Sequence, residues 1–277
     1  MIERDLLYYA MRVMRGEILR HASRESCILS SRLLCHVYRE LGYSAMPICV
    51  GATALNARAF ELVTTGREAE SADDPDSFGI AIRHQYVEDP PEDGMFPGHV
   101  AVVAGDYFVD PSADQMSRPE HRLFIEPILA SFADEQTGSI MDFIEGSVEP
   151  AYRLPDGGMV MYRAFADDTS YYTSGDWKNM HPGDALYERI LDTTLGLVEA
   201  VRDCDELPPL PPLPRSHSSY EGATPEAIED GLRSARELGE EIPPEVLRAA
   251  LAAQSEAANA TARQVGKMAD AAAGLFR

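Results

Sequence analysis

GHVAVVAGDYFVD, residues 98–110, is the stretch that most strongly predicts the fold. Two apolar runs flank Gly105-Asp106, and a Gly-Asp pair suits the central positions of a tight turn, so we expect a β-hairpin. Counting outward from this turn pairs residue 104 with 107 and residue 101 with 110. His99 then lies diagonally across from Asp110 on the same face, with the two Cβ atoms roughly 7–8 Å apart. The hairpin therefore predicts a His–Asp pair at its open end.

CILSSRLLCHVYRELGYSA, residues 27–45, predicts a helix that leads into a strand. Its apolar residues recur at helical spacing, Ser23 or Ser26 can cap the start, and Gly42 lies where a helix commonly ends in a glycine. Cys27 falls at the start of this helix. There the helix dipole and the free backbone N–H groups favour the thiolate, which is the reactive form of cysteine.

The rest of the periodic sequence predicts further helices and strands around these two stretches. We expect helices over 2–21 and 184–202, and strands over 45–54, 78–87 and 158–165. Two more cysteines fall inside apolar patterns: Cys35 lies on the helix among leucine and valine, and Cys49 lies in a predicted strand. We expect both thiols to be core residues, as buried free cysteines usually are.

The combination of Cys27, His99 and Asp110 points to nucleophilic catalysis by a thiol. A carboxylate fixes the tautomer of an imidazole and stabilises the imidazolium, and an imidazolium beside a thiol lowers the thiol pKa. Taken singly, each residue type is more often structural, since a cysteine packs as a small apolar residue and Asp-Pro starts a turn. The three together are the stronger signal.

The same two stretches resemble transglutaminase-like cysteine enzymes. Residues 27–45 resemble the helix that carries the family's nucleophile, and residues 98–112 resemble its second block, in which a His precedes a strand and Asp-Pro follows the next one. The resemblance implies that Cys27 is the nucleophile, His99 the general base and acid, and Asp110 the residue that orients His99. It also implies a papain-like α+β core with the nucleophile helix packed on an antiparallel sheet.

The resemblance extends over residues 1–115 and departs from the family at positions that affect substrate recognition. Ala101 stands where the family has Trp, Val103 where it usually has an acid, and Met46 where Arg commonly follows the alanine.

An oxyanion hole needs two hydrogen-bond donors beside the reacting carbonyl. The backbone N–H of Cys27 is one natural donor, because it points out from the helix N-terminus. His21, Ser23 and Gln85 are candidates for the second, and we rank Gln85 first because a side-chain amide is a good donor.

Composition excludes several classes of protein. The chain has 277 residues and a net charge of −22, so it would repel phosphate backbones and anionic lipids, and we expect neither nucleic-acid nor membrane binding. There is no apolar run long enough to span a membrane and no signal-peptide pattern at the start, which predicts a cytoplasmic protein. The four cysteines form no disulfide framework or CxxC pair, and no nucleotide-binding loop is present, so we expect no metal and no cofactor.

The composition also predicts three parts. Residues 1–204 would form the catalytic domain, with residues 116–203 extending the core. Residues 205–222 contain LPPLPPLP and form a Pro-rich linker that could instead be an SH3-type ligand. Residues 223–277 are expected to form a helical tail with a thin heptad seam over 247–275. The seam would pack on its own domain or form a homo-oligomeric coiled coil, and the remaining alternative is a disordered tail.

The sequence therefore predicts a cysteine-dependent acyl-transfer enzyme that cleaves or exchanges an amide bond through a thioester. We expect a peptide or protein amide as substrate, and the acidic loops 68–76 and 88–93 would favour a Lys-bearing one if they flank the cleft. The alternative is a non-catalytic scaffold that uses its Pro-rich segment and helical tail for interaction or assembly.

Overall fold

The computed structural model describes residues 3–22, 26–71, 74–82, 96, 98–132, 138–179, 181–202, 204 and 206–214. Gln85, the acidic loop 88–93 and the tail 223–277 lie outside this part of the chain. The described helices are α1 (Glu3–His21), α2 (Cys27–Glu40), α3 (Ala57–Thr64), α4 (Ile140–Ile144), α5 (Gly175–Asn179) and α6 (Ala185–Arg202). The strands are β1 (Ala45–Leu55), β2 (Gly79–Ile82), β3 (His99–Ala104), β4 (Tyr107–Asp110), β5 (Ile128–Ser131), β6 (Ala151–Arg153) and β7 (Met159–Ala164).

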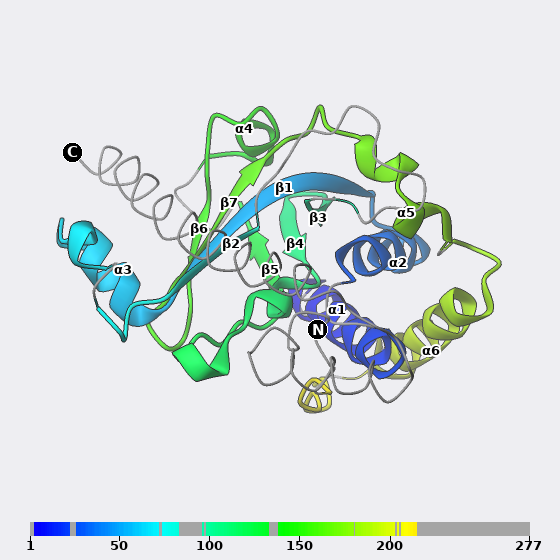
Figure 1. Ribbon diagram of the computed structural model, residues 1–277. Helices are drawn as coiled ribbons and strands as arrows, with labels where there is room; N and C mark the ends of the chain where they lie inside the picture. Colours follow the sequence, from blue (N-terminus) through cyan, green and yellow to red (C-terminus); the bar gives the residue numbers. More distant parts are fainter. Residues whose placement is uncertain are drawn as a thin grey trace, which may run out of the picture.

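The described strands form one antiparallel sheet around the long strand β1. The order is β5-β4-β3-β1-β7-β6, and β2 pairs with the second half of β1, beyond the point where β3 ends. β7 runs along the other edge of β1 and continues the sheet to β6. All these pairings are antiparallel. The protein is therefore of the α+β class, with a curled sheet and helices beside it (Figure 1).

The β3–β4 hairpin has the predicted register. Ala104 pairs with Tyr107, and Val102 pairs with Val109. Gly105 adopts a φ of 57°, which is the left-handed conformation that a tight turn requires and that glycine adopts at low cost. The turn chemistry thus sets the alignment of the two strands, and with it the relative position of His99 and Asp110.

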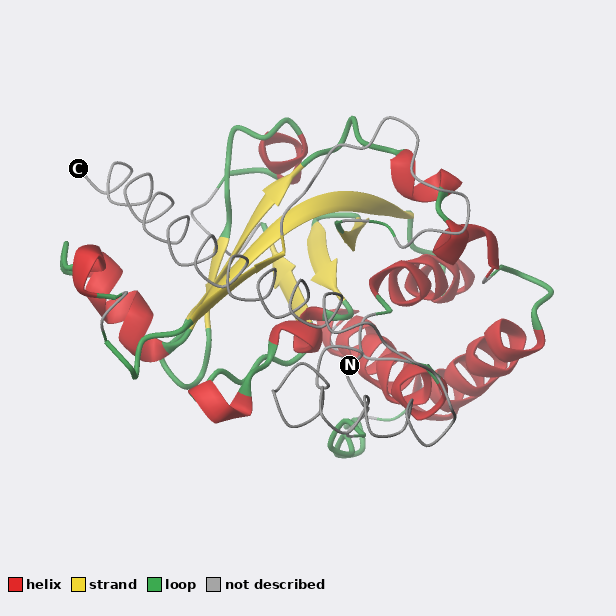
Figure 2. Ribbon diagram, in the orientation of Figure 1, coloured by secondary structure: helices red, strands yellow, loops and turns green. Residues whose placement is uncertain are grey.

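Three helices gather beside the sheet, as Figures 1 and 2 show. α2 packs on β1 and β3, and α1 packs on both α2 and α6. The apolar stripes of these helices and one face of the sheet form a single core cluster, which includes Leu7, Met14, Leu33, Val102 and Val198. The predicted helices over 2–21 and 184–202 are confirmed to within a residue, and α2 ends before Gly42, whose φ of 91° matches the predicted C-terminal glycine.

The other face of the sheet carries a second core rich in aromatic residues. Phe108 of β4 packs against Tyr162 of β7 with ring centroids 4.6 Å apart, and against Phe143 of α4 at 5.2 Å. Ala113 and Met116, from the turn that follows β4, close this core. The turn after β4 is therefore held tightly against the sheet.

The first residues of the predicted Pro-rich linker pack on the domain. Leu207 and Leu210 contact the core cluster beside α1, and the Arg12 side chain donates to the carbonyl of Pro211 over 3.5 Å. In the described part of the chain, no helix has the combined length and apolar character needed to cross a bilayer.

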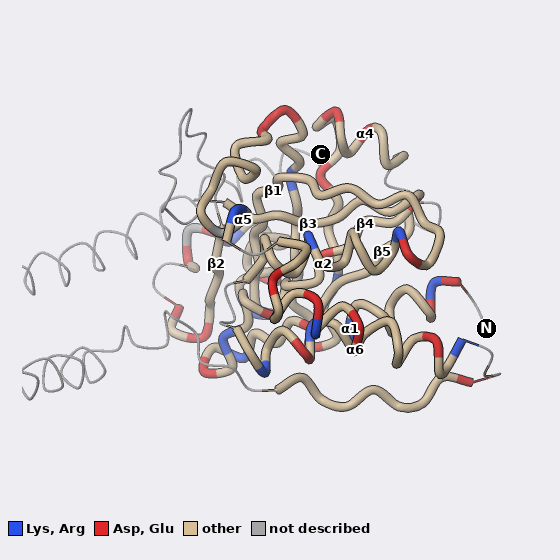
Figure 3. The backbone as a smooth tube through the Cα atoms, turned by 90° about the vertical axis from the view of Figure 1, so that its right-hand side faces the viewer, with Lys and Arg blue, Asp and Glu red and all other residues tan. Residues whose placement is uncertain are grey.

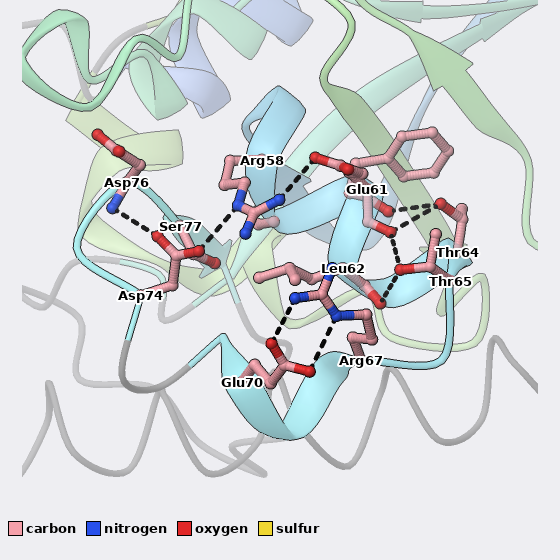
Figure 4. Close-up of polar contacts among 12 residues, drawn as sticks. Arg58, Glu61, Leu62, Thr64, Thr65, Arg67, Glu70, Asp74, Asp76 and Ser77 are labelled. Atoms are coloured by element: carbon pink, nitrogen blue, oxygen red, sulfur yellow. Dashed lines mark hydrogen bonds and ion pairs between the residues drawn. The ribbon is translucent and has the colours of Figure 1, made fainter.

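Negative charge is spread over several loops and helices (Figure 3). In the acidic loop 68–76, Arg67 pairs with Glu70, and Arg58 bridges Glu61 and Asp74 (Figure 4). This loop follows α3, at the opposite end of the molecule from α2 (Figure 1). Loop 68–76 therefore does not flank Cys27, and the condition under which it would favour a Lys-bearing substrate there is not met.

Candidate active site

Cys27 is the first residue of α2, as the sequence predicts. Ser26 is the N-cap residue, and the Cys27 side chain is half-buried. Its thiol packs against an apolar cluster that includes Ile28, Val100 and Tyr171. The first N–H groups of a helix have no partner within that helix, and the helix dipole favours negative charge there. The position thus suits a thiolate.

His99 and Asp110 form a buried pair at the open end of the β3–β4 hairpin. Nε2 of His99 lies 2.7 Å from Oδ2 of Asp110, and neither side chain is exposed to solvent. Their diagonal relation across the hairpin, predicted from the turn, is confirmed. Because Asp110 engages Nε2, the imidazole presents its other nitrogen, Nδ1, to the remainder of the site.

The Asp110 carboxylate has further donors besides His99. The hydroxyl of Tyr162 donates to Oδ2 over 2.8 Å, and the backbone N–H of Ser112 donates to Oδ1 over 3.0 Å. Burial by itself raises the pKa of Asp110, but His99 and these hydrogen bonds outweigh burial and hold that pKa below its usual value. Asp110 is therefore a carboxylate at neutral pH, which orients His99 and stabilises its charged form.

His99 is set up to carry a proton. Burial by itself lowers the pKa of His99, but the charge and hydrogen bond of Asp110 oppose this, and a side-chain hydrogen bond with Cys27 adds to them. Together they raise the pKa of His99 to about 10. This interaction puts the Cys27 thiol close to the imidazole. Cys27, His99 and Asp110 come from three different elements, and the fold brings them together.

The structure adds one residue that the sequence did not single out, Gln115. Its Nε2 lies 2.6 Å from Nδ1 of His99, and its side chain is buried. Gln115 belongs to a 3-10 turn, Ala113–Met116, that begins just after the Asp110-Pro111 step. The sequence pointed to Gln115 only through its closeness to Asp110. A glutamine in a predicted loop does not by itself indicate a contact with a catalytic residue. Of the predicted oxyanion donors, Gln85 and Ser23 lie outside the described residues, and His21 ends α1.

A buried ion pair behind the site was also missed. The Arg15 guanidinium of α1 forms a two-contact ion pair with the Asp114 carboxylate. The Nε–Oδ1 and Nη2–Oδ2 distances are 2.7 and 2.9 Å. Its Nη1 donates to the hydroxyls of Ser26 and Ser30 over 2.9 and 3.1 Å. Arg15 thus ties the N-terminus of α2, next to Cys27, to the turn that carries Gln115. The sequence does indicate that Arg15 is buried, because it lies on the same stripe of α1 as the buried residues Leu7 and Met11.

The other thiols differ from Cys27. Cys35 and Cys49 are buried, as predicted, and burial raises the pKa of Cys35 to about 12 and that of Cys49 further. Cys204 is exposed. The described residues contain no group of three His, Cys, Asp or Glu side chains that could hold a metal ion. A cavity of about 410 Å³ lies between β5 and β6, and none of its lining residues belongs to the Cys27–His99–Asp110 group.

Comparisons with known proteins do not identify the chain. No family model matches it, and no curated protein matches it. One solved structure, described as the crystal structure of genomics APC5867, is similar to it with a TM-score of 0.37 and 14% sequence identity, over 71% of this chain and 80% of that one.

Proposed function

We propose that the protein is a cysteine-dependent acyl-transfer enzyme that acts on an amide bond through Cys27, His99 and Asp110. The observation that carries the proposal is the buried 2.7 Å pair of His99 with Asp110, together with a cysteine at a helix N-terminus within hydrogen-bonding reach of the same imidazole. A thiol, a base and a group that orients the base are the parts that nucleophilic catalysis by cysteine requires.

The chemistry follows from the positions of the protons. His99 accepts the Cys27 proton at Nδ1, and the thiolate sulfur attacks the amide carbonyl carbon. The tetrahedral intermediate collapses when His99 returns the proton to the leaving nitrogen, so that the C–N bond breaks and a thioester remains on Cys27. Water or a second amine then attacks the thioester with His99 as base, and the thiol is restored. Hydrolysis is the simpler outcome, because transamidation needs an additional acceptor site.

The carbonyl oxygen gains negative charge in this intermediate. The backbone N–H of Cys27 lies in the first turn of α2, where the helix supplies no acceptor for it, so it can donate to that oxygen. The resemblance of residues 27–45 and 98–112 to transglutaminase-like enzymes supports the same roles, and the packing of α2 on β1 and β3 is compatible with a papain-like core.

The surroundings of Cys27 favour an apolar group on the acyl side of the substrate. Phe96, Tyr171 and Trp177 belong to the apolar cluster against which Cys27 packs. Arg32 stacks on the Trp177 ring with its guanidinium carbon 4.5 Å from the ring centroid, which holds that ring in place. Aromatic faces next to the nucleophile suit a peptide or protein amide with an apolar residue at the scissile carbonyl.

The test is the rate at which iodoacetamide labels each cysteine as a function of pH, measured by peptide mass spectrometry. An ordinary thiol has a pKa near 8.5 and reacts slowly below about pH 7. We expect Cys27 to react rapidly at pH 6 in the wild-type protein and slowly in His99→Ala. The exposed thiol of Cys204 is the internal reference, and the buried thiols of Cys35 and Cys49 should remain unlabelled.

The opposite result would point to the scaffold alternative. If Cys27 reacts no faster than Cys204 at pH 6, and His99→Ala leaves its rate unchanged, then Cys27 is no nucleophile. Circular dichroism of His99→Ala guards against a rate lost through unfolding. In that case, the residues after 204 would be the part of the chain to test for binding.

A further inference from the structure

Gln115 and Asp110 hold the two nitrogens of one buried imidazole. Asp110 engages Nε2 of His99 at 2.7 Å, and the side-chain amide of Gln115 engages Nδ1 at 2.6 Å. Gln115 is only 8% exposed, so water competes little for this contact. The ring is therefore fixed from both sides by the segment 110–115.

The proton that Cys27 gives up has to reach Nδ1, because Nε2 is occupied by Asp110. Gln115 contacts that same nitrogen. With its amide N–H turned to the ring, Gln115 donates to the lone pair of a neutral Nδ1. With its amide oxygen turned to the ring, it accepts the proton of a charged imidazolium. In either orientation Gln115 shares Nδ1 with Cys27, which interacts with the same imidazole.

The backbone around Gln115 is held so that the amide stays at the ring. Asp114, the preceding residue, is paired with Arg15 through two contacts of 2.7 and 2.9 Å. The Arg118 side chain donates to the carbonyl of Gln115 over 2.9 Å. Met116 is fully buried in the core below β4. The packing and hydrogen bonds of the residues on each side of Gln115 thus hold its side chain in contact with His99.

We infer that Gln115 is a positioning residue that fixes the His99 ring and competes with Cys27 for its Nδ1 atom, which restrains the reactivity of the thiol. The inference rests on the proposed function, because it assigns a role to Gln115 within that site. The charged or titratable groups that act on His99 are Asp110 and Cys27, and Tyr162 acts through its hydrogen bond to Asp110. Any change in reactivity on substituting Gln115 is therefore to be measured against pH.

The test compares iodoacetamide labelling of Cys27 in Gln115→Met and in wild type. Methionine keeps the length of glutamine but offers no amide to Nδ1. The loss of one competing hydrogen bond predicts labelling about fivefold faster at pH 6. At pH 9, above the pKa of about 8.5 of an ordinary thiol, the two rates should agree. Faster labelling at pH 6 without faster labelling at pH 9 indicates competition for Nδ1. A general structural effect of the substitution would change the labelling rate at both pH values.

Two further variants keep the test decisive. Ser117→Ala is the matched control, because Ser117 is buried in the same segment and bonds to the backbone of Ile125. It should label at the wild-type rate. Gln115→Glu has the same shape as wild type and puts a carboxylate on Nδ1, which binds the imidazolium proton more strongly than the amide does. This variant should label more slowly than wild type at pH 6, and it serves if Gln115→Met fails to fold.

The failure of this inference is distinguishable from the failure of the proposed function. If wild-type Cys27 is fast and depends on His99, but Gln115→Met labels at the same rate or more slowly, then Gln115 does not compete with Cys27 and the inference is refuted alone. If wild-type Cys27 is itself labelled slowly and at a rate that does not depend on His99, both the proposed function and the role of Gln115 are refuted.

Discussion

Arg15→Met would leave the Asp114 carboxylate buried without the guanidinium that neutralises it. The Arg15 side chain is fully buried and that of Asp114 is 8% exposed, so water cannot replace the lost partner. Removing one member of a buried, hydrogen-bonded ion pair destabilises a protein by about 3–5 kcal/mol. For a domain of this size, that corresponds to a fall in Tm of roughly 6–20 °C. The Ser26 and Ser30 hydroxyls lose their donor as well.

Urea and thermal unfolding followed by circular dichroism measure this effect. The matched control is Arg67→Ala, because Arg67 makes a similar two-contact pair with Glu70 on the exposed surface (Figure 4). Its loss should leave Tm nearly unchanged, since solvent screens an exposed pair. The double variant Arg15→Met/Asp114→Leu should recover most of the loss, because an apolar pair can replace a buried ion pair at little cost.

A loss below about 1 kcal/mol in Arg15→Met would refute the reasoning, since it would mean that Asp114 reaches water or another cation. A second measurement connects the pair to the site. Because Arg15 binds Ser26 next to Cys27 and Asp114 next to Gln115, labelling of Cys27 under folding conditions should change in Arg15→Met. It should be unaffected in Arg67→Ala.

Three further predictions concern His99, Asp110 and Gly42. Asp110→Asn removes the charge that stabilises the His99 imidazolium, so labelling of Cys27 at pH 6 should fall, and by less than in His99→Ala. The His99 pKa is about 10 in the folded protein and about 6.5 in the unfolded chain. Its contribution to stability is therefore fully present below pH 6.5 and is lost as the pH rises through 10. Urea unfolding should show a free energy that declines over this window, and a His99→Gln variant should show a flatter profile; equal slopes would contradict the assignment. Gly42→Ala should destabilise by about 1 kcal/mol in the same assay through backbone strain alone, because φ is 91° and a Cβ there would meet no neighbour. No loss would show that the end of α2 can rearrange.

Local patterns were enough to predict the elements that carry the candidate site. The apolar runs on either side of Gly105-Asp106 set the hairpin register, and that register places His99 and Asp110 on one face. The apolar stripe of residues 27–41 and the glycine after it bound α2, so that Cys27 falls at its start. These features depend on residues close together in sequence, whose geometry is set by backbone sterics and turn chemistry.

Contacts between distant segments could not be predicted in this way. The role of Gln115 could not be predicted, because only the packing of Ala113 and Met116 into the core brings the 113–116 turn against His99. The sequence left open whether the acidic loop 68–76 flanks the site, and its ion pairs tie it to α3 instead.

The sequence by itself therefore predicted helices α1, α2 and α6, the hairpin and the three candidate catalytic side chains. Tertiary structure alone decided that Cys27 reaches His99, that Arg15 meets Asp114, and that Gln115 contacts Nδ1. The physical reason is that periodicity and turn residues specify which face of an element is buried. The choice of partner on that face follows from how the helices and the sheet fill one core, a property of the whole chain.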